Sequence, residues 1–517
     1  MTRNGKWQTT RRGFLRMITR AATGGAATAL AAPMISPSPA AGGASGGKKP
    51  LNFVIILVDD MGWTDLTCFG SKYYETPNID RLAAGGMKFT DAYAACAVCS
   101  PTRAAVMTGR YPARVGVTDW IRARFQGGKG AAERGKIPEY VKPNPNKKVI
   151  CPQNPFWMEL DEVTIAETLK PAGYTSCHVG KWHLGPDEYY PTAQGFDHNY
   201  GGCDFGQPPS YFDPYRTKRL TDGIPTLPPR KEGEYLTDRE SDEAVGFIRK
   251  HRDKPFFLYM AHYAVHTPLQ SKKDLKEKYK AKPPTNQKNS TYAGMVQSVD
   301  ESTGKILAAL KELGLTENTM VIFTSDNGGL LGATNNAPLR SGKGYPYEGG
   351  IRVPLIVRWP GVTKPGTTSK TPAISVDYFP TICRAAGVSL PAGRTIDGVD
   401  LRPVLDGTGK LDRDAIYWHF PHYRHRDVPP YSIIRAGDWK LIKRYDGKRF
   451  ELFNLADDLS ETTDLSDKMP EKVKELDTRL KAFLKDAGAK LPKPNPDYKP
   501  APARPAGKNK KAPKKPR

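Results

Sequence analysis

The sequence predicts an α/β protein built on a large mixed, mostly parallel sheet sandwiched by helices, with a smaller C-terminal α+β domain that carries an antiparallel sheet. From about residue 50, short apolar runs alternate with segments of helical periodicity, which is typical of βαβ units. After about residue 405, four short strand-like runs follow one another and a single helical segment ends them. That order is typical of a small antiparallel sheet packed against one helix.

Four apolar runs of the first region predict buried strands, and each is followed by polar, ionisable residues. The runs cover residues 52–58, 174–179, 255–261 and 320–324, and the residues that follow them include Asp59 and Asp60, Lys181 and His183, His262 and His266, and Asp326 and Asn327. Ligands of open α/β sheets bind at the carboxyl ends of the strands. These side chains therefore predict one functional site at one edge of the sheet.

Helices are predicted for residues 78–84, 162–171, 237–250 and 290–313. Residues 119–158 and 204–234 are rich in glycine, proline and lysine and show little periodicity. We expect long loops there, which in a compact domain are often functional. The second region predicts strands at 415–420, 431–435, 440–444 and 450–454 and a helix at 470–485. The chain contains no glycine-rich nucleotide-binding motif.

The length of 517 residues predicts two or three domains. We expect a signal peptide over residues 1–42, a large domain that carries the site over 48–405, a C-terminal α+β subdomain over 406–487, and a disordered basic tail over 488–517. The tail combines lysines and prolines with almost no apolar residues, so it cannot bury enough surface to offset its ordering entropy.

Residues 1–42 carry six basic residues and no acidic one. The segment from Thr10 to Arg16 resembles the twin-arginine export motif, and a weakly apolar stretch and a small-residue segment follow it in the order that export requires. The alternative is a disordered basic arm. The apolar stretch is too short to cross a bilayer, so we expect no transmembrane span. Export makes the twin-arginine (Tat) translocase a partner and places the mature protein in a bacterial periplasm or outside the cell.

The formal net charge is +24, from 78 Lys and Arg against 54 Asp and Glu. Such an excess usually raises nucleic acid or a membrane surface as a partner. More than half of it lies in the two ends, however, because residues 490–517 hold ten basic residues and one acidic residue. We therefore expect no nucleic-acid partner, and we expect the remaining positive charge to face a smaller anionic ligand.

The seven cysteines are an odd and sparse set for this length, which excludes a disulfide scaffold. Cys96 and Cys99 form a C-x-x-C pair, but no second ligand pair is near enough for zinc, and the surroundings are not those of a redox motif. Pro101 suits the first turn of a helix that Ser100 could cap. Cys99 would then lie at a helix N-terminus, where the helix dipole favours a negative charge.

Cys99, Pro101, Arg103, Thr108 and Gly109 form the pattern C-x-P-x-R-x4-T-G. On this pattern the chain resembles the sulfatase family of the alkaline-phosphatase-like superfamily, in the style of its arylsulfatase and N-acetylgalactosamine-6-sulfatase branch. The resemblance covers most of residues 50–465 and makes residues 48–405 the catalytic domain. It includes, in order, the segments 59–60, 180–183, 265–268, 325–328, 343 with 348–354, 376–381, 397–400 and 451–455.

The resemblance implies that a formylglycine-generating or sulfatase-maturating enzyme oxidises Cys99 to Cα-formylglycine. It also implies one divalent cation per chain, Ca²⁺ in preference to Mg²⁺, with these ligands: Asp59, Asp60, Asp326, Asn327 and residue 99. Oxygen ligands of this kind suit a hard cation rather than zinc. Adjacent strand residues point to opposite faces, so Asp59 and Asp60 can share an ion only where the strand bends.

The remaining roles follow from the same resemblance and from charge. The hydrated aldehyde would supply the nucleophile, and the cation, Lys181 and Lys343 would neutralise the sulfate oxygens. Arg103 would hold the diol and the metal-site carboxylates in place. His266 would protonate the leaving alcohol, and His183 would take the proton of the second hydroxyl, which expels sulfate. We interpret His262 as structural.

The expected function is therefore hydrolysis of sulfate esters, on a sulfated glycan or an aryl sulfate. Two alternatives remain open: a phosphonate or phosphodiester hydrolase of the same superfamily, and a binder of sulfated glycans without turnover. The loops at 119–158 and 204–234 are expected to select the substrate, which the sequence does not identify.

Overall fold

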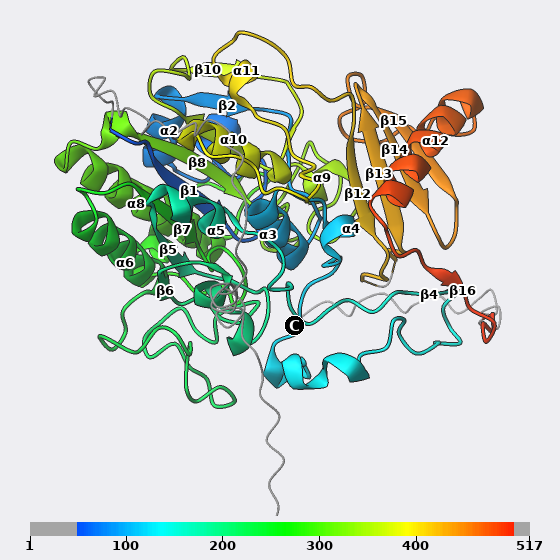
Figure 1. Cartoon of the computed structure of the whole chain (residues 1–517), viewed down its shortest axis with the longest axis horizontal. Coiled ribbons are helices and arrows are strands. Elements are labelled where there is room, and N and C mark those ends of the chain that lie inside the picture. The colour runs from blue at the N-terminus through cyan, green and yellow to red at the C-terminus, as the bar shows by residue number, and fades with distance from the viewer. Residues whose placement is uncertain (1–48, 426, 501–517) are drawn as a thin grey trace, which may run out of the picture. The chain divides into compact units, whose positions relative to one another are not determined.

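The computed structural model describes residues 49–425 and 427–500, and its largest element is an eight-stranded sheet (Figure 1). The strand order is β10-β2-β9-β8-β1-β7-β5-β6, and all neighbouring pairs are parallel except β2–β9 and β8–β9. The predicted mixed, mostly parallel sheet is confirmed. Its strands are β1 (Asn52–Val58), β2 (Met87–Phe89), β5 (Thr175–Gly180), β6 (His198–Tyr200), β7 (Phe256–Ala261), β8 (Thr319–Ser325), β9 (Leu355–Arg358) and β10 (Thr367–Ser369).

Strand β1 lies between β7 and β8, and all seven of its residues are buried. A central parallel strand is covered on both faces, which is why its sequence is a continuous apolar run rather than an alternating one. Val54, Ile56 and Val58 belong to the hydrophobic core on one face, and Ile55 and Leu57 belong to the core on the other. The sheet thus separates two cores.

Helices cover both faces of the sheet (Figure 1). The first core receives side chains of α2 (Pro77–Ala84), α6 (Leu236–Lys250), α7 (Lys273–Ala281) and α8 (Ser290–Glu312). The second core receives side chains of α3 (Cys99–Thr108), α5 (Ile165–Leu169) and α10 (Tyr378–Ala386). Helix α8 begins where the Asn289 side chain accepts hydrogen bonds from the backbone N–H groups of Thr291 and Tyr292, a normal N-cap.

Shorter elements connect these layers. They comprise β3 (Ala92–Tyr93) with β11 (Ala373–Ile374), β4 (Val149–Ile150) with β16 (Lys493–Pro494), and the helices α4 (Pro112–Val115), α9 (Glu348–Ile351) and α11 (Arg402–Leu405). The 3₁₀ turns are Thr67–Phe69, Arg124–Gln126, Ala131–Lys136, Lys170–Ala172, Asp187–Tyr189, Pro191–Gln194, Thr316–Asn318 and Ser375–Asp377. Residues 119–158 and 204–234 are otherwise mostly irregular, as expected of long loops.

The C-terminal subdomain is a four-stranded antiparallel sheet in the order β12-β13-β14-β15, formed by β12 (Ile416–Phe420), β13 (Tyr431–Ala436), β14 (Trp439–Arg444) and β15 (Phe450–Asn454). Leu476 and Leu480 of α12 (Pro470–Asp486) pack on one face. Trp418 and Ile433 on the other face join a core shared with Ala105 of α3. The sheet is thereby held between its own helix and the part of the chain that contains the eight-stranded sheet.

A buried ion cluster fastens the two parts together. Lys440 of β14 is fully buried and its Nζ lies 2.9 Å from Glu348 Oε1 and 2.8 Å from Glu461 Oε1. Glu348 belongs to α9, outside the C-terminal subdomain, and burial of such charges costs free energy unless each is paired. Lys440 and Arg435, which pairs with Asp91, therefore fix how the antiparallel sheet packs on the rest of the protein.

Residues 488–500, which the sequence predicts to be part of a disordered tail, include ordered structure. Residues 493–494 form β16, which pairs with β4, and Asn495 is buried. The Asn495 side-chain amide donates to the backbone oxygens of Asn144 and Lys147 at 2.8 and 2.7 Å. Amino-acid composition did not predict that residues 493–495 are ordered, because backbone pairing and one asparagine, rather than buried apolar side chains, hold them in place. Residues 501–517, the remainder of the expected tail, lie outside the described residues.

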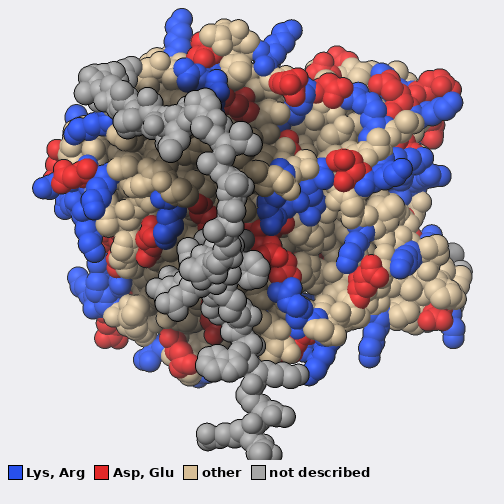
Figure 2. All heavy atoms as spheres, viewed as in Figure 1, with Lys and Arg blue, Asp and Glu red and all other residues tan. Residues whose placement is uncertain are grey.

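The expected signal peptide over 1–42 also lies outside the described residues. Within the residues that the structure describes, no helix is long and apolar enough to cross a bilayer. On the face of the molecule in Figure 2, basic and acidic side chains are interspersed.

Truncation should separate the two parts of the C-terminal segment. Deleting residues 488–517 removes β16 and the Asn495 hydrogen bonds, each of which contributes roughly 1 kcal/mol, so the loop at 144–150 should become a preferred protease site. The measurement is limited proteolysis with mass-spectrometric mapping, and deletion of residues 501–517 is the control. Equal cleavage of this loop in both truncated proteins would contradict the anchoring role of β16.

Candidate active site

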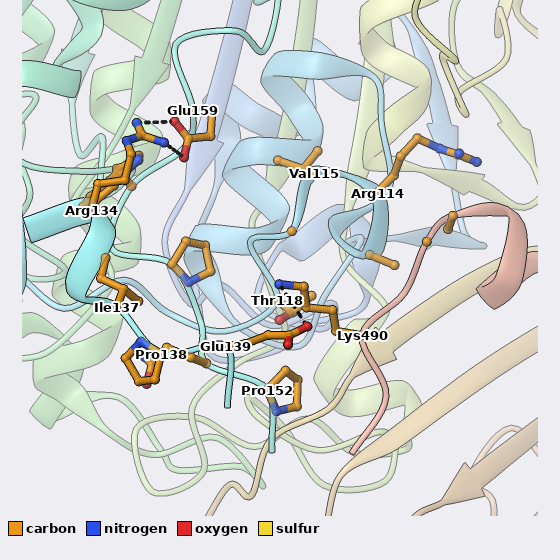
Figure 3. A pocket seen from close by; sticks show the side chains of 17 residues that line it. Arg114, Val115, Thr118, Arg134, Ile137, Pro138, Glu139, Pro152, Glu159 and Lys490 are labelled. Carbon is orange, nitrogen blue, oxygen red and sulfur yellow. Dashed lines mark hydrogen bonds and ion pairs between the residues drawn. The ribbon is translucent and has the colours of Figure 1, made fainter. Parts of the chain in front are cut away.

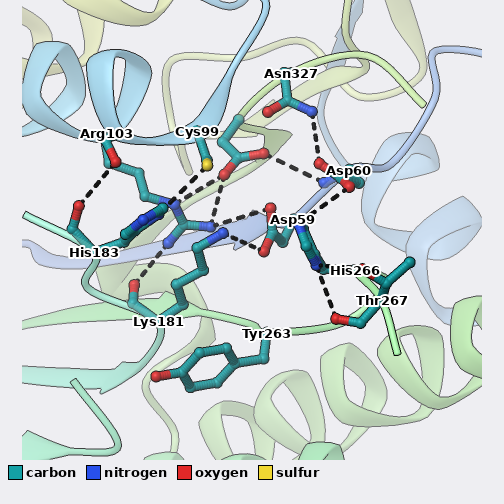
Figure 4. A network of polar contacts seen from close by, with 12 residues as sticks. Asp59, Asp60, Cys99, Arg103, Lys181, His183, Tyr263, His266, Thr267 and Asn327 are labelled. Atoms are coloured by element: carbon teal, nitrogen blue, oxygen red, sulfur yellow. Dashed lines mark hydrogen bonds and ion pairs between the residues drawn. The ribbon is translucent and has the colours of Figure 1, made fainter. Parts of the chain in front are cut away.

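The carboxyl ends of four strands converge on one site (Figure 4). The side chains that meet there are Asp59 and Asp60 after β1, Lys181 and His183 after β5, His266 after β7, and Asp326 and Asn327 after β8. Strands β5, β7, β1 and β8 are neighbours in the sheet, so their ends share one edge. The structure therefore brings together the side chains that the four apolar runs predicted, and it adds Cys99 and Arg103 from α3 and Lys343 from the loop before α9.

Asp59 and Asp60 share the site because the chain bends directly after β1. Asp60 has φ 61°, in the left-handed region that aspartate tolerates better than most residues. Its backbone N–H donates to Asp326 Oδ1 at 3.3 Å, which holds the bend against β8. Ligand atoms of Asp59, Asp60 and His266 lie within 4.8 Å of one another. The bend that the sequence required is thus present.

Arg103 is the centre of the polar network. Its guanidinium donates from Nε to Asp326 Oδ2 at 2.8 Å and from one terminal nitrogen to the Lys181 backbone oxygen at 2.6 Å. The other terminal nitrogen lies 2.8 Å from Asp326 Oδ2 and 3.9 Å from Asp59 Oδ1. The side chain is only 1% exposed, and these carboxylates raise its pKa despite burial. Arg103 therefore joins α3 to three strand ends.

Each carboxylate of the site has a cationic partner. Asp326 pairs with Arg103, Lys181 Nζ lies 2.6 Å from Asp59 Oδ2, and Lys343 Nζ lies 2.5 Å from Asp60 Oδ1. Burial and the neighbouring Asp326 raise the pKa of Asp59. Burial would also raise the pKa of Asp60, but Lys343 and His266 outweigh it and hold that pKa well below its usual range.

Three buried oxygens in this network accept no hydrogen bond: Asp59 Oδ1, Asp60 Oδ2 and Asn327 Oδ1. Asn327 donates from Nδ2 to Asp60 Oδ1 at 2.8 Å, and its own side-chain oxygen, Oδ1, accepts no hydrogen bond. Unpaired buried acceptors cost free energy, and they are expected where another group completes the site. The oxygens are therefore a candidate cation-binding set.

Cys99 is the first residue of α3, as its position before Pro101 predicted, and it is 4% exposed. The expected cap is wrong, because Val98 occupies the N-cap position and Ser100 lies inside the first turn. Ser100 Oγ instead donates to the His183 backbone oxygen at 2.9 Å and accepts from the Ile121 N–H at 3.0 Å. Ser100 is used to position the neighbouring loops.

His183 faces the Cys99 thiol with a defined ring nitrogen. Its Nδ1 lies 3.4 Å from Cys99 Sγ, while Nε2 lies 2.7 Å from the Ile121 backbone oxygen. A carbonyl oxygen only accepts, so Nε2 carries the proton and the Nδ1 lone pair points at residue 99. Burial and the nearby Lys181 lower the pKa of His183 well below its usual value, which keeps the ring neutral.

His266 has the opposite tautomer. Its Nδ1 lies 2.8 Å from the Thr267 backbone oxygen and therefore carries the proton, which leaves Nε2 directed at Asp60 Oδ2, 3.6 Å away. Burial and Lys343 lower the pKa of His266 to about 3. His262, interpreted as structural, is fully buried and bonds Glu240 at 2.7 Å, away from the cavity described next.

A cavity of about 190 Å³, here called the catalytic cavity, opens over residue 99. Four predicted residues line it: Cys99, His183, His266 and Lys343. Lys181 does not, because it is fully buried against Asp59. The other lining residues are Trp120 and Gln126 from the first long loop, Gly206 and Gln207 from the second, and Arg424 from the C-terminal subdomain.

The sequence indicated that both loops lie near the site but singled out no residue in them, and it did not indicate that Arg424 lines the cavity. A cluster of histidine, tyrosine and arginine between β12 and β13 was the available signal. Gly206 shows why the second loop needs a glycine, since a Cβ there would lie 2.7 Å from His183 Cε1. The loop backbone thus packs directly against the imidazole.

All seven cysteines are free thiols. Cys96 and Cys99 therefore form no disulfide, and within the described residues the only cluster of three or more histidine, cysteine or acidic ligands is Asp59, Asp60 and His266. Neither Cys96 nor Cys99 belongs to that cluster, which goes against the zinc interpretation of the C-x-x-C pair.

Comparison with known proteins agrees with this geometry. A family model described as Sulfatase matches residues 51–388, and one described as N-sulphoglucosamine sulphohydrolase, C-terminal, matches residues 342–490. The chain belongs to the sulfatase family. It is a sulfatase enzyme, and the family predicted from the Cys99 pattern is confirmed.

Named relatives are similar over most of their length. The chain is 35% identical over 505 residues to a sulfatase of Formosa agariphila, covering 84% of this chain and 87% of that protein. It is 37% identical to the N-acetylgalactosamine-6-sulfatase of Mus musculus, covering 72% and 70%. Among solved structures, Ps i-CgsB is 32% identical with a TM-score of 0.71, covering 85% of this chain and 94% of that one.

Replacing Arg103, the buried cationic side chain at the centre of this sulfatase site, should destabilise the whole fold. Arg103→Met leaves the carboxylates of Asp326 and Asp59 buried without the positive charge of the guanidinium. Breaking a buried ion pair in this way lowers the free energy of unfolding by about 3–5 kcal/mol. The measurement is the free energy of unfolding in urea. Cys99→Ala is the control, because Cys99 forms no ion pair. If the two variants were equally stable, the guanidinium would not hold the strand ends together.

Proposed function

We propose that this sulfatase hydrolyses sulfate esters of a sulfated carbohydrate, with a nucleophile derived from Cys99 and a bound divalent cation. The observation that carries the proposal is the arrangement around residue 99. Its side chain lies at the N-terminus of α3, 3.4 Å from the unprotonated nitrogen of His183, in a cavity that Lys343 and His266 also line.

A maturation enzyme, either formylglycine-generating or sulfatase-maturating, is the partner that would convert Cys99. Formylglycine at this position would supply a hydroxyl nucleophile from its hydrated aldehyde. The helix N-terminus and the neighbouring lysines favour negative charge there. Among the described residues, His183 Nδ1 is the ring nitrogen that contacts residue 99, and its lone pair can accept a proton from that residue. His183 therefore acts as a base.

Lys343 and His266 act on the sulfate ester. Lys343 Nζ lines the catalytic cavity and would bind a sulfate oxygen. His266 holds its Nδ1 proton on the Thr267 oxygen, so a proton for the leaving alcohol must be carried on Nε2. A bound anionic ester would favour the protonated ring, whereas burial and the neighbouring Lys343 disfavour it. Lys181 acts from beneath the cavity by holding Asp59.

The cation-binding set would consist of Asp59, Asp60, Asp326, Asn327 and residue 99. The residues fit a hard cation, because three of them are carboxylates and three buried oxygens lack a hydrogen-bond partner. A set made of protein oxygens favours Ca²⁺, since Mg²⁺ usually retains several waters. The ion would withdraw charge from the sulfate oxygens. Arg103 orients the set by fixing Asp326.

A sulfated glycan is the substrate class that relatives support. Ps i-CgsB was solved with k-i-k-neocarrahexaose, and that structure is 31% identical to this chain with a TM-score of 0.70. The twin-arginine-like segment predicts export through the Tat translocase. An exported enzyme would encounter such a glycan in the periplasm or outside the cell. The proposal includes no nucleic-acid partner.

Sulfate release decides between the candidate activities. Purified enzyme from a host with a maturation system should hydrolyse an aryl sulfate, and Cys99→Ala should lower kcat by at least about 10³-fold, in the range for loss of a nucleophile. Mass spectrometry of the peptide containing residue 99 should show an aldehyde in place of the thiol. Intact thiol in active enzyme would contradict the formylglycine mechanism.

Two further outcomes favour the alternatives. Faster turnover of an aryl phosphate diester than of the aryl sulfate would favour the phosphodiesterase. Binding of sulfated polysaccharide that survives Cys99→Ala, with no sulfate release by the unaltered protein, would favour a binder without turnover.

Cation binding should also stabilise the folded protein independently of activity. Removal of divalent cations with a chelator should lower the melting temperature, and Ca²⁺ should restore it, because a ligand at 100 times its Kd stabilises by about 2.7 kcal/mol. Asn327→Ala removes one unpaired oxygen and should shrink the Ca²⁺-dependent shift. Asn318→Ala, at the surface, is the control. A melting temperature that ignores chelator and Ca²⁺ would contradict a cation site.

A further inference from the structure

The catalytic cavity is too small to hold an oligosaccharide. Its volume is about 190 Å³, below the roughly 300–1,000 Å³ of sites that enclose an organic ligand of moderate size. It can accept the reacting sulfate and the sugar that carries it. The rest of a glycan chain must therefore lie on neighbouring surface, and the structure shows which surface adjoins the cavity.

A second cavity of about 320 Å³, here called the lysine cavity, has no lining residue in common with the catalytic cavity, but two chain segments contribute neighbouring residues to both. Asp119 lines the lysine cavity and the next residue, Trp120, lines the catalytic cavity. Likewise, Tyr423 lines the lysine cavity and Arg424 lines the catalytic cavity. Consecutive Cα atoms are about 3.8 Å apart, so at two points the linings of the two cavities are one residue apart along the chain.

The lysine cavity carries uncompensated positive charge. Among the described residues, neither Lys142 nor Lys147 lies within ion-pair distance of a carboxylate, and the same holds for Arg424, which lines the catalytic cavity. Lys147 Nζ lies 4.2 Å from the centre of the Tyr423 ring, a cation–π contact that positions the ammonium without neutralising it. Asp119 is the one acid in the lining, and its Oδ1 accepts the Trp120 N–H at 2.8 Å.

A third cavity nearby provides the contrast (Figure 3). It is larger, at about 490 Å³, and Thr118, the residue before Asp119, lines it. Its cations are all paired: Arg114 with Asp397 and Asp486, Arg134 with Glu159, and Lys490 with Glu139. Size alone would favour this cavity, but it has no free charge for an anion. The lysine cavity has such charge.

The wall that carries the lysines is held in shape before any ligand arrives. Asn495 fixes the backbone oxygens of Asn144 and Lys147, and the backbone N–H of Lys499 donates to the Pro145 oxygen at 2.8 Å. Tyr423 is fixed by a 2.7 Å hydrogen bond from its hydroxyl to Asp446 Oδ2. Such preorganisation lowers the entropy cost of binding.

We propose that the lysine cavity is a subsite that binds a second anionic group of the substrate through Lys142 and Lys147, while Arg424 bridges the two cavities. The substrate class is then an oligosaccharide with at least two anionic substituents, one of which is the ester that is cleaved. The second anion is a sulfate or a carboxylate, which share this recognition chemistry. The inference rests on the proposed function of the catalytic cavity.

The test compares K142M/K147M with the unaltered enzyme on two kinds of substrate. The probes are sulfated hexasaccharides from carrageenan, chondroitin sulfate and heparin, and a singly sulfated aryl ester. The ratio of kcat/KM on the preferred hexasaccharide to kcat/KM on the aryl ester should fall about tenfold, through KM, and further in K142E/K147E. The loss should shrink at high salt. A partly desulfated hexasaccharide and one whose carboxylates are reduced identify which group the lysines bind.

K364M/K370M is the matched control, because these two lysines are exposed, as Lys142 is, lack an ion-pair partner among the described residues and lie beside the edge strand β10. It should leave the ratio unchanged. An unchanged ratio in K142M/K147M, or the same fall in the control, would overturn the subsite.

A measurement of hexasaccharide binding tests the subsite independently of the proposed hydrolytic function. With Cys99→Ala as background, calorimetric titration of the same hexasaccharides should show about tenfold weaker binding for K142M/K147M. If the unaltered enzyme released no sulfate, the proposed function would fail and the titration would still decide the subsite. Equal Kd values in the two proteins, or no binding of any hexasaccharide at low salt, would overturn it.

Discussion

The buried guanidinium of Arg103 is the contact on which the site depends. It brings together the ends of β1, β5 and β8 at the N-terminus of α3, a point where three carboxylates crowd into the interior. Buried carboxylates that lie close together repel one another unless basic groups neutralise them. Here each carboxylate pairs with one basic side chain: Asp326 with Arg103, Asp59 with Lys181 and Asp60 with Lys343. Because each basic group occupies one oxygen, Asp59 and Asp60 each keep another oxygen free for a further ligand. Pairing thus both stabilises and preorganises the site.

The two histidines show how the fold assigns distinct roles to identical side chains. A backbone carbonyl fixes each ring: Ile121 takes the Nε2 proton of one and Thr267 the Nδ1 proton of the other. One lone pair therefore faces residue 99 and the other faces Asp60. Neither orientation comes from the histidines themselves; both come from the loops that follow β5 and β7 and from the loop after α4.

The C-terminal subdomain contributes to the site as well as to stability. Lys440 and its two glutamates anchor the antiparallel sheet to α9, and the turn between β12 and β13 then places Arg424 at the catalytic cavity. Three consecutive residues, from Thr118 to Trp120, line three different cavities. The first long loop therefore contributes to all three cavities, and β16 pairs with β4 within that loop.

The sequence alone determined the fold class, because buried parallel strands appear as continuous apolar runs whose polar ends share an edge, and the Cys99 pattern determined the family. It also indicated that Asp59 and Asp60 required a bend, which the structure shows at Asp60. Only the tertiary structure decided which charges are paired, which nitrogen of His183 faces residue 99, and that Arg424 and residues 493–495 belong to the site's surroundings. Those features depend on contacts between residues that are 62 to 351 positions apart in the chain, and a local sequence pattern does not specify such contacts.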